Sequence, residues 1–347
     1  MRLGWRGLLG IALSVLLLWF TLRGVDLHEV WTVLSTSSIP LWIASTVAAT
    51  LIFPLRARRW QALLAPVAGR LPLGPLWRGT AIGMMVNNVL PMRAGEPARA
   101  YALTRERREL RFTAAFASLA VDRLFDGTVV LGLMLLATMD PRFPADATVF
   151  GATAWSIAAS AATVLAAVFV VLALLAYAPT FFLALSDRIW GAVLPGLAPK
   201  IRGMLEGAIG GLGVMRDPKL ALEVLWWAIL HWLMNAFAFW LGFKALAIAA
   251  PFSAALFTQG LIGIGVSLPS APGFFGIFEL AGKAGLSLYG VSDADAVSWA
   301  LGFHLLSFIP ITVLGAWYFS RLDLHLADIK DAKEEAAHVG EAQGPDA

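Results

Sequence analysis

Residues 84–100 have the sequence MMVNNVLPMRAGEPARA, in which an apolar run breaks at Pro91 and charged side chains follow at once. These charged residues are Arg93, Glu96 and Arg99, and Gly95 stands among them. Proline removes a backbone donor and does not continue a helix, so we expect the apolar segment to end here. A break inside hydrocarbon-soluble sequence predicts a broken or re-entrant membrane segment.

A second break of the same kind occurs 178 positions later, in residues 264–279, IGVSLPSAPGFFGIFE. The alignment sets Leu268-Pro269 on the earlier Leu-Pro pair and Gly273 on the earlier glycine. Glu279 ends the second run, much as a glutamate ends the first. Such pairs of interrupted segments form the binding site in many secondary transporters. Two unrelated loops with Leu-Pro at helix ends are the alternative interpretation.

The composition defines the class of protein. Apolar residues make up 59% of the 347 positions and charged residues 14%, which is more apolar surface than a water-soluble fold can hide. We therefore predict an all-α polytopic membrane protein with about six to eight transmembrane helices. The chain has no cysteine, which excludes disulfides and thiolate metal sites. Nucleic acid is disfavoured as a partner, because the basic residues adjoin lipid-length segments and form no recognisable binding module.

The basic residues indicate how the chain crosses the membrane. Residues 7–22 are apolar, follow Arg2 and Arg6, and precede no small-residue cleavage site, so we predict an uncleaved span with a cytoplasmic N-terminus. Residues 23–38 then lie outside, and residues 39–55 return to the cytoplasm. Five arginines follow without an acidic residue, a strong sign of the cytoplasmic side: Arg56, Arg58, Arg59, Arg70 and Arg78.

The segment between Arg78 and Arg93 is too short to cross a bilayer. Its 14 uncharged residues reach roughly 21 Å as a helix, against a hydrocarbon core of roughly 30 Å. Its far flank is also basic, so we expect the segment to dip into the membrane and return to the same side. Asn87 and Asn88 are costly facing lipid. We expect their amides to serve backbone groups freed at the break, with contact to a ligand as the alternative.

Residues 112–137 form a lipid-length segment that carries Asp122, Arg123 and Asp126. Each charge at membrane depth costs roughly 2.5 to 3.5 kcal/mol on insertion scales, so the three need partners. The two aspartates share one helix face with Ser118, and Arg123 is placed to pair with Asp126. Either these residues form a structural ion pair between helices, or they face the same cavity as Glu96.

The rest of the chain predicts a further series of membrane segments. A span at 149–178 is followed by an interfacial linker rich in glycine and proline at 179–219 and by a second span at 220–248. Two short apolar segments, 252–268 and 273–289, either span or re-enter. A last span at 297–319 leads to a polar cytoplasmic tail at 321–347.

This order makes the two halves of the chain antiparallel. Residues 39–137 and 220–319 each contain a span, a broken segment and a span, and the predicted directions are opposite in the two halves. Both lie in one integral membrane domain, residues 1–320, and both termini are cytoplasmic. Inverted repeats of this kind are used for alternating access.

Three weaker patterns complete the prediction. His231 and Asn235 share a helix face, where hydrogen bonding between helices is expected rather than metal binding, because no third ligand is evident. Glu279 and Lys283 are four positions apart and are expected to pair. Residues 293–295, DAD, match the carboxylate pair of metal-dependent glycosyltransferases, but so short a match in an external turn carries little weight. We expect no metal and no cofactor.

With these residues assembled, the chain resembles the lysylphosphatidylglycerol synthase transmembrane-region family, also described as flippase-like membrane proteins. The resemblance covers most of the chain and depends on three groups of residues in combination. They are Asn88-Val-Leu-Pro91 with Arg93, Gly95, Glu96 and Arg99; Ser118 with Asp122, Arg123 and Asp126; and Leu268-Pro269 with Pro272, Gly273, Gly276 and Glu279.

The resemblance implies lipid handling without identifying the lipid. The family includes flippase regions of enzymes that aminoacylate phosphatidylglycerol, proteins tied to hopanoid and isoprenoid pathways, and archaeal proteins linked to glycan assembly. The aminoacylating members carry a large soluble catalytic domain after the last span, whereas only residues 321–347 follow it here. We therefore expect no synthesis of aminoacylated lipid by this chain.

Our leading hypothesis is a bacterial inner-membrane lipid translocator that moves a phosphate-bearing lipid or lipid-linked precursor between leaflets. The two broken segments form a central cavity through which the headgroup passes while the tails stay in the bilayer. Arginines bind the phosphate, and carboxylates hold these arginines in the empty site or carry a coupling proton. The predicted substrate-binding or coupling residues are Asn88, Arg93, Glu96, Arg99, Asp122, Arg123, Asp126, Pro269, Gly273 and Glu279.

Two further hypotheses belong to other classes of protein. One is a membrane enzyme or accessory subunit of envelope lipid or glycolipid synthesis, with Glu96 and Asp122 as acid and base. The other is a scaffold without transport.

In the leading hypothesis Glu96 pairs with Arg99, and the two form the functional centre with the second break, residues 269–276. The expected partners are an anionic or phosphate-bearing membrane lipid and envelope-lipid biosynthetic enzymes.

Overall fold

The computed structural model describes residues 5–90, 94–149, 151–211, 214, 217–267 and 272–325. These residues are helical apart from their connections and one small antiparallel strand pair. The longer elements are α1 (Trp5–Leu22), α3 (Ile39–Ala68), α4 (Leu73–Val89), α6 (Phe112–Ala137), α7 (Ala154–Tyr177), α10 (Pro218–Ala245), α11 (Phe252–Ser267) and α13 (Asp293–Arg321). The shorter elements are α2 (Leu27–Ser35), α5 (Gly95–Glu106), β1 (Thr148–Val149), β2 (Ala152–Thr153), α8 (Pro179–Val193), α9 (Ala198–Gly211), the 3₁₀ turn η2 (Pro272–Phe274) and α12 (Ile277–Leu288).

The predicted class, an all-α polytopic membrane protein, is confirmed. Among the described residues, α3, α10 and α13 are long and apolar enough to cross a membrane, and 154–168 and α11 are shorter apolar helices. Two of the three charges of α6, on Asp122 and Asp126, lie at buried positions, where partners within the protein offset their cost in a lipid-length helix.

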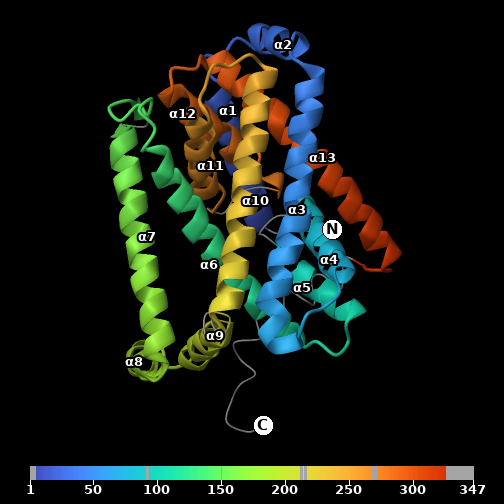
Figure 1. Ribbon diagram of the computed structural model, residues 1–347, viewed down its shortest axis with the longest axis vertical. Coiled ribbons are helices and arrows are strands. Elements are labelled where there is room, and N and C mark those ends of the chain that lie inside the picture. Colours follow the sequence, from blue (N-terminus) through green and yellow to red (C-terminus); the bar gives the residue numbers. More distant parts are fainter. Residues whose placement is uncertain are drawn as a thin grey trace.

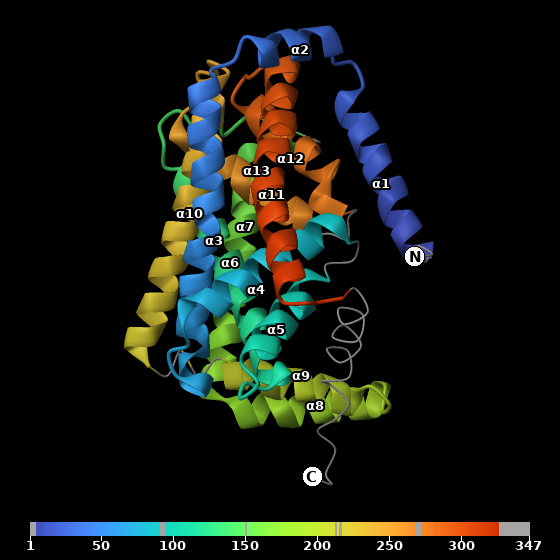
Figure 2. The ribbon, with the colours of Figure 1, turned by 90° about the vertical axis from the view of Figure 1, so that its right-hand side faces the viewer.

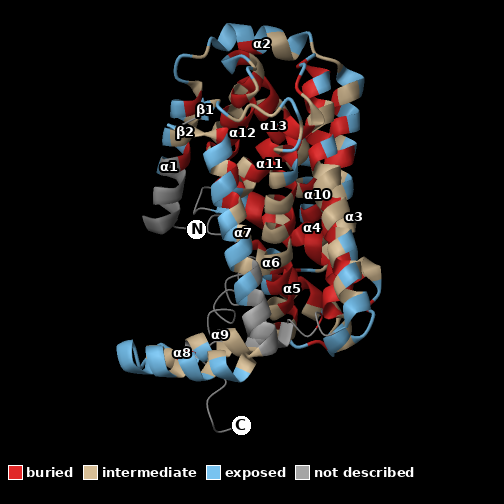
Figure 3. Ribbon diagram, turned by 60° about the vertical axis from the view of Figure 1, so that its left-hand side comes forward, coloured by how far each residue is buried: buried red, intermediate tan, exposed pale blue. Residues whose placement is uncertain are grey.

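The long helices form an upright bundle that is closed at each end by short helices (Figures 1 and 2). Helices α3 and α10 run antiparallel and pack along each other, with α13 beside them. Helix α2 lies across one end of the bundle, and α8 and α9 lie across the other. These last two occupy the linker that the sequence predicted to be interfacial. Figure 3 shows that α7 and α8 expose much of their surface, whereas the inner helices are buried.

Each predicted break lies at the tip of a helical hairpin. Helices α4 and α5 form one hairpin in the half of the bundle nearer α8 and α9, and α11 and α12 form the other in the half nearer α2 (Figure 2). The two tips meet, because α4 contacts η2. Residues 91–93, 268–271 and 326–347 lie outside the described residues.

Small residues allow the two arms of each hairpin to pack closely. A β-carbon on Gly83 of α4 would lie 2.7 Å from the carbonyl oxygen of Gly95 and 2.9 Å from the β-carbon of Arg99 on α5. In the second hairpin, a β-carbon on Gly285 would lie 2.6 Å from the hydroxyl of Thr258. Close backbone approach of this kind is the usual way in which helices associate where lipid removes the hydrophobic driving force.

The first helices of the two predicted halves run in opposite directions, and so do the helices that follow the two hairpins. Helix α3 leads toward the α8–α9 end, the first hairpin enters from that end, and α6 returns. Helix α10 leads away from it, the second hairpin enters from the opposite end, and α13 returns.

At the end of the bundle nearer α2, the carboxylate of Asp140 accepts hydrogen bonds from Arg142 and from Ser253 at the start of α11. These bonds lower the pKa of Asp140 below its usual range, and the bond from the Arg142 side chain contributes most to this shift.

One predicted boundary is wrong. The second span was expected to end at residue 55, before a cytoplasmic run of arginines, but α3 continues to Ala68 and buries Arg56 and Arg59. The reason is that both guanidinium groups find carboxylates on α6, which removes the cost that would otherwise keep them at the membrane surface.

Single cysteines test whether the first hairpin begins and ends on the same side, and the chain offers a background free of cysteine. We expect Val67→Cys and Glu109→Cys to resist an impermeant maleimide applied to intact cells, and Met139→Cys to react. All three positions are exposed in the structure, so burial does not protect them. Labelling of Glu109→Cys but not Val67→Cys would show that the hairpin region crosses the membrane.

Candidate functional site

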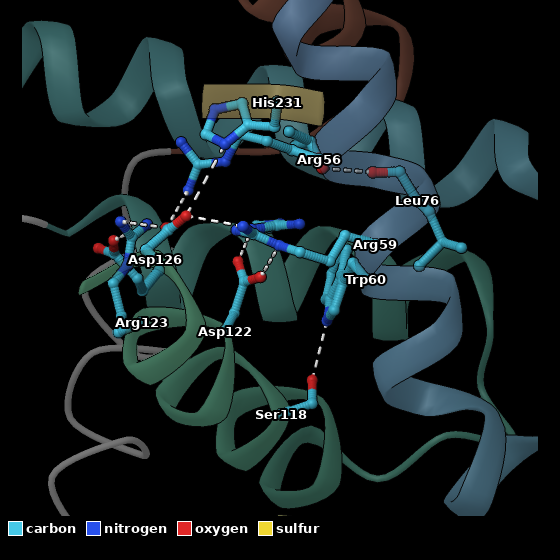
Figure 4. Close-up of polar contacts among 12 residues, drawn as sticks. Arg56, Arg59, Trp60, Leu76, Ser118, Asp122, Arg123, Asp126 and His231 are labelled. Atoms are coloured by element: carbon cyan, nitrogen blue, oxygen red, sulfur yellow. Dashed lines mark hydrogen bonds and ion pairs between the residues drawn. The ribbon is translucent and has the colours of Figure 1, made fainter. Parts of the chain in front are cut away.

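Seven arginine, aspartate and glutamate side chains from three helices meet inside the bundle and form what we call the arginine–carboxylate cluster. Figure 4 labels five of them, together with His231 of α10, whose Nδ1 lies 3.8 Å from Oδ1 of Asp126. Four guanidinium groups face three carboxylates, which leaves one positive charge in excess. The members are Arg56 and Arg59 from α3, Glu96 and Arg99 from α5, and Asp122, Arg123 and Asp126 from α6.

Arg59 is the centre of the cluster. Its Nε lies 2.6 Å from Oδ1 of Asp122, and its Nη1 lies 2.7 Å from Oδ1 of Asp126. The side chains of Arg59 and Asp122 are fully buried. Desolvating such charges costs several kcal/mol for each ion, a cost that only close pairing offsets. The contacts of Arg59 therefore fix the position of α6 against α3.

The two aspartates have further partners on other helices. Nη1 of Arg99 lies 3.2 Å from Oδ2 of Asp122, and Nη2 of Arg56 lies 3.7 Å from Oδ2 of Asp126. The indole of Trp232 on α10 donates to Oδ1 of Asp126 at 2.9 Å. Asp126 thus joins α3, α6 and α10.

The cluster also has a less buried edge, formed by Glu96 and Arg123. Their closest atoms are 2.8 Å apart, and the side chain of Arg123 is 45% exposed. Arg123 also approaches Asp126 at 3.4 Å, which confirms the predicted pairing of these two residues. The predicted pairing of Glu96 with Arg99 is wrong, because α6 offers each of them another partner: Arg123 for Glu96, and the buried Asp122 for Arg99.

An aromatic ring holds Arg99 from its other side. The guanidinium carbon of Arg99 lies 4.1 Å from the ring centroid of Trp60, a cation–π contact. The indole of Trp60 in turn donates to the hydroxyl of Ser118 at 2.8 Å. Ser118 shares a helix face with the cluster aspartates, as predicted, and it acts here by orienting the tryptophan.

A small hollow lies against the cluster and is lined by Arg56, Asn87, Glu96, Arg99 and Arg123, among others. Its volume of about 10 Å³ is close to that of one water molecule. The amide oxygen of Asn87 accepts a hydrogen bond from the backbone of Gly95 at 2.8 Å, which confirms that this side chain serves the backbone at the break.

Several guanidinium groups of the cluster have donors left over. Nε of Arg56, Nη2 of Arg59, and both Nε and Nη2 of Arg99 are buried and find no hydrogen-bond partner among the described residues. Buried donors are normally satisfied, because leaving one unpaired costs about 1–3 kcal/mol. Two of these arginines line the hollow, so the cluster has both the donors and the net charge to receive an anion.

A larger cavity of about 210 Å³ lies between the two hairpin tips. Its walls are mainly apolar, with polar groups from Asn88, Asn235, Gln259 and His304. It adjoins the hollow, since Met84 lines both. The amide of Asn88 was expected to serve the backbone at the break, but it donates to the side chain of Thr312 on α13 at 2.7 Å. Asn235 donates to Gln259 on α11 at 3.2 Å, the hydrogen bond between helices that was predicted for it.

The second break has a different chemistry from the first. Gly273 has a φ of 67°, and Glu279 is fully buried beside His304 on α13. The predicted pairing of Glu279 with Lys283 is wrong, because Lys283 reaches Asp293 instead, at 2.9 Å. Glu279 also contacts no arginine among the described residues, so the prediction that it holds one is wrong there.

The structure therefore divides the predicted site residues between two places. The cluster contains Glu96, Arg99, Asp122, Arg123 and Asp126. Asn88 and Gly273 line the cavity, and Glu279 is buried beside it with His304. Arg93 and Pro269 lie outside the described residues. Within the part of the chain that the structure describes, three or more His, Asp or Glu side chains nowhere gather so as to hold a metal ion.

The sequence prediction placed Arg56 and Arg59 on the cytoplasmic side and so missed their part in the cluster. It also missed Trp60 and the role of His304. One signal could have found the arginines. Residues 56–64, RARRWQALL, contain no helix-breaking residue, so the helix of the second span could continue through them. For His304 the sequence offers no such signal, because its partner lies 25 positions away on another helix.

Fold and site together define a polytopic α-helical membrane protein with a buried ionic cluster and a central cavity between two helical hairpins. The comparison with known families agrees: residues 7–315 match the family described as "Lysylphosphatidylglycerol synthase TM region". The chain belongs to that family. It is also similar to a curated protein of Haloferax volcanii named glycosyltransferase AglD, with 26% identity over 362 aligned residues. The match covers 95% of this chain but only 56% of that protein.

Removing Arg59 should test its central position. We expect Arg59→Met to lower the free energy of unfolding by about 3–5 kcal/mol, because it leaves two buried carboxylates short of their main cation. Chemical unfolding in detergent micelles, followed by circular dichroism, measures the change. Arg70→Met is the matched control, since Arg70 forms an exposed pair with Glu223 that is worth about 0–1 kcal/mol. Equal stability of the two variants would contradict the assignment.

Proposed function

We propose that this chain is a lipid translocator that carries a lipid with a phosphate-bearing headgroup between leaflets of the bacterial inner membrane. The observation that supports it most is the arginine–carboxylate cluster, with its excess positive charge and its unpaired donors on Arg56 and Arg99. Guanidinium groups are the donors best suited to phosphate oxygens, which they bind in a fixed, often bidentate geometry. The net charge alone disfavours a cationic ligand.

The position of the cluster supports a lipid rather than a soluble anion. The hollow beside the cluster adjoins a mainly apolar cavity, and Met84 belongs to the walls of both. Trp232 connects the two chemically, since it lines the cavity and donates to Asp126 of the cluster. A ligand with a phosphate at one end and a hydrocarbon chain at the other fits this arrangement, with the phosphate at the charged hollow and the chain in the apolar cavity.

The closed hollow indicates how the site would work. A volume of about 10 Å³ holds a water molecule but not a phosphate, so binding requires the cluster to open. The Glu96–Arg123 contact is its least buried edge. In this proposal a phosphate competes with Glu96 for Arg123, which gives the open and closed states different affinities, as any ligand-driven switch requires.

The paired hairpins provide the two states. We propose that residues 39–137 and 220–319 are inverted repeats, whose hairpins enter from opposite faces and meet at the cavity. Rocking of one repeat against the other would expose the cavity first to one leaflet and then to the other. Both termini lie in the cytoplasm in this arrangement, and enzymes of envelope-lipid synthesis are the partners that would supply or consume the lipid.

A second candidate is an enzyme or accessory subunit of glycolipid synthesis, which the similarity to the Haloferax protein favours. That protein is much longer than this chain, so its named activity extends to this chain only as a hypothesis. Asp122 is a poor general base here, because Arg59 and Arg99 both hold its carboxylate. Incubating the purified protein with lipid phosphate and a sugar nucleotide tests for transfer.

Arg99→Ala should impair transport. Hydrogen bonds to charged groups contribute about 1.5–3 kcal/mol, so losing this donor should slow transport about tenfold or more. The measurement is the rate at which fluorescent phosphatidylglycerol becomes accessible to dithionite in liposomes, against a fluorescent glucosyl lipid that has no phosphate. Arg70→Ala, which changes an exposed arginine outside the cluster, should behave as the wild type. Normal rates for Arg99→Ala at equal protein content would refute the proposed site.

Glu96→Gln should keep the fold but block release. Glutamine preserves a hydrogen-bond acceptor for Arg123 at a partly exposed position, while it removes the charge that competes with phosphate. We expect calorimetry to show tighter binding of short-chain phosphatidylglycerol, and we expect transport to be slowed about tenfold or more. The reason is that a site which binds its ligand equally well in the open and closed states does not shift the equilibrium between them. Glu223→Gln, the partner of Arg70, is the control. Unchanged transport by Glu96→Gln would show that Glu96 is structural.

A further inference from the structure

The second hairpin carries an ionisable pair that the proposed phosphate site does not use. Glu279, on the first turn of α12, and His304, in the middle of α13, are both buried. Nδ1 of His304 lies 2.5 Å from Oε1 of Glu279. His304 also lines the cavity between the hairpin tips, so the pair borders the space proposed for the lipid.

Both members of the pair hold the tip of the hairpin. The second carboxylate oxygen of Glu279 accepts a hydrogen bond from the backbone N–H of Gly276 at 2.6 Å. Nε2 of His304 lies 2.8 Å from the carbonyl oxygen of Gly273. Gly273 and Gly276 both have positive φ, of 67° and 87°. The pair therefore ties a sharply turned segment of backbone to α13.

The hydrogen-bond geometry determines how many protons the pair holds. A carbonyl oxygen only accepts, so Nε2 of His304 must carry a hydrogen. Nδ1 then meets Oε1 of Glu279 across a single shared hydrogen, either as imidazolium with carboxylate or as neutral imidazole with carboxylic acid. Both descriptions contain the same number of protons. Loss of that proton leaves the lone pair of Nδ1 facing a carboxylate, and the contact turns from attractive to repulsive.

The surroundings leave the pair without another charged partner among the described residues. Aromatic rings enclose the imidazole, with centroids of Phe275 and Phe278 at 4.5 and 4.4 Å. Helix α11 contributes no charged side chain. Four charged groups on the other helices around the pair have partners of their own: Lys283 with Asp293, Arg78 with Glu106, Asp295 with Ser292, and Arg321 with Trp317. Helix α1, which packs against α12, carries one charged residue, Arg6.

From this geometry we infer that Glu279 and His304 bind the proton that drives transport. The inference depends on the proposed function and names its coupling ion. With the proton bound, the tip of the second hairpin is tied to α13, and the cavity keeps the shape seen here. When the proton leaves to the more alkaline side, the tip detaches and the second repeat is free to rock. The proton is taken up at one face and released at the other, and no other bond changes.

The test uses the full chain in liposomes of phosphatidylethanolamine and phosphatidylglycerol, with fluorescent phosphatidylglycerol as the probe. A difference of one pH unit should change the distribution of the probe between leaflets by up to about tenfold, if one proton moves with each lipid. His304→Gln should give the same distribution with and without the gradient. Each variant is compared with itself, so a general slowing cancels. Ser320→Ala, at an exposed position of α13 outside the cavity wall, should respond as the wild type does.

Two outcomes separate the inference from the proposed function. If the wild type transports the probe at equal pH but ignores the gradient, or if His304→Gln follows the gradient, proton binding by this pair is refuted and translocation stands. If the wild type transports nothing, spin labels at Val89→Cys and Ser267→Cys, beside the two tips, still decide the question. Their separation should change between acidic and alkaline pH, and His304→Gln should abolish that change. A separation independent of pH would refute the inference.

Discussion

The structure depends on one buried guanidinium group. Arg59 is fully buried, and two of its three nitrogen atoms, Nε and Nη1, hold the carboxylates of Asp122 and Asp126 at 2.6 and 2.7 Å. None of these three charges could stay at this depth alone, since the desolvation cost is offset only when all three are paired. The helices α3 and α6 must therefore meet here. Because Asp126 also accepts from Trp232, the first helix of the second half is held at the same point.

The two hairpins solve a second constraint. Backbone that turns back inside a bilayer must satisfy its own polar groups or line a cavity. In the first hairpin, Asn87 accepts from the backbone of Gly95, and in the second, Glu279 accepts from the backbone of Gly276. Close packing at small residues, such as Gly83, brings the arms near enough for these bonds. Both tips then border one cavity of about 210 Å³.

The halves share this architecture but differ in their chemistry. The first hairpin supplies Glu96 and Arg99 to a cluster of permanent charges, which suits the binding of an anion. The second supplies Glu279 to a contact with the imidazole of His304 at 2.5 Å. In the proposed function, the ionic cluster beside the first hairpin and the Glu279–His304 pair beside the second would together link the movement of a lipid to that of a proton.

The sequence alone determined the class of protein, both breaks and the charged residues of α6. Composition and the Leu-Pro positions are local properties, and they can be read without knowing which helices pack together. It could not determine the ion pairs. Glu96 was expected to bind Arg99, its neighbour three positions on, but each found a partner on α6 instead.

Only the tertiary structure decided the extent of the site. Arg56 and Arg59 follow an apolar span, so by sequence they look like residues of the cytoplasmic surface. Burial of their charges becomes favourable only when α6 brings its two aspartates alongside. The contact between Glu279 and His304 likewise joins separate helices, and no spacing within either helix indicates it. Local pattern thus determines where a chain of this kind enters the membrane and where it breaks, while the pairing of charges at depth depends on helix packing in three dimensions.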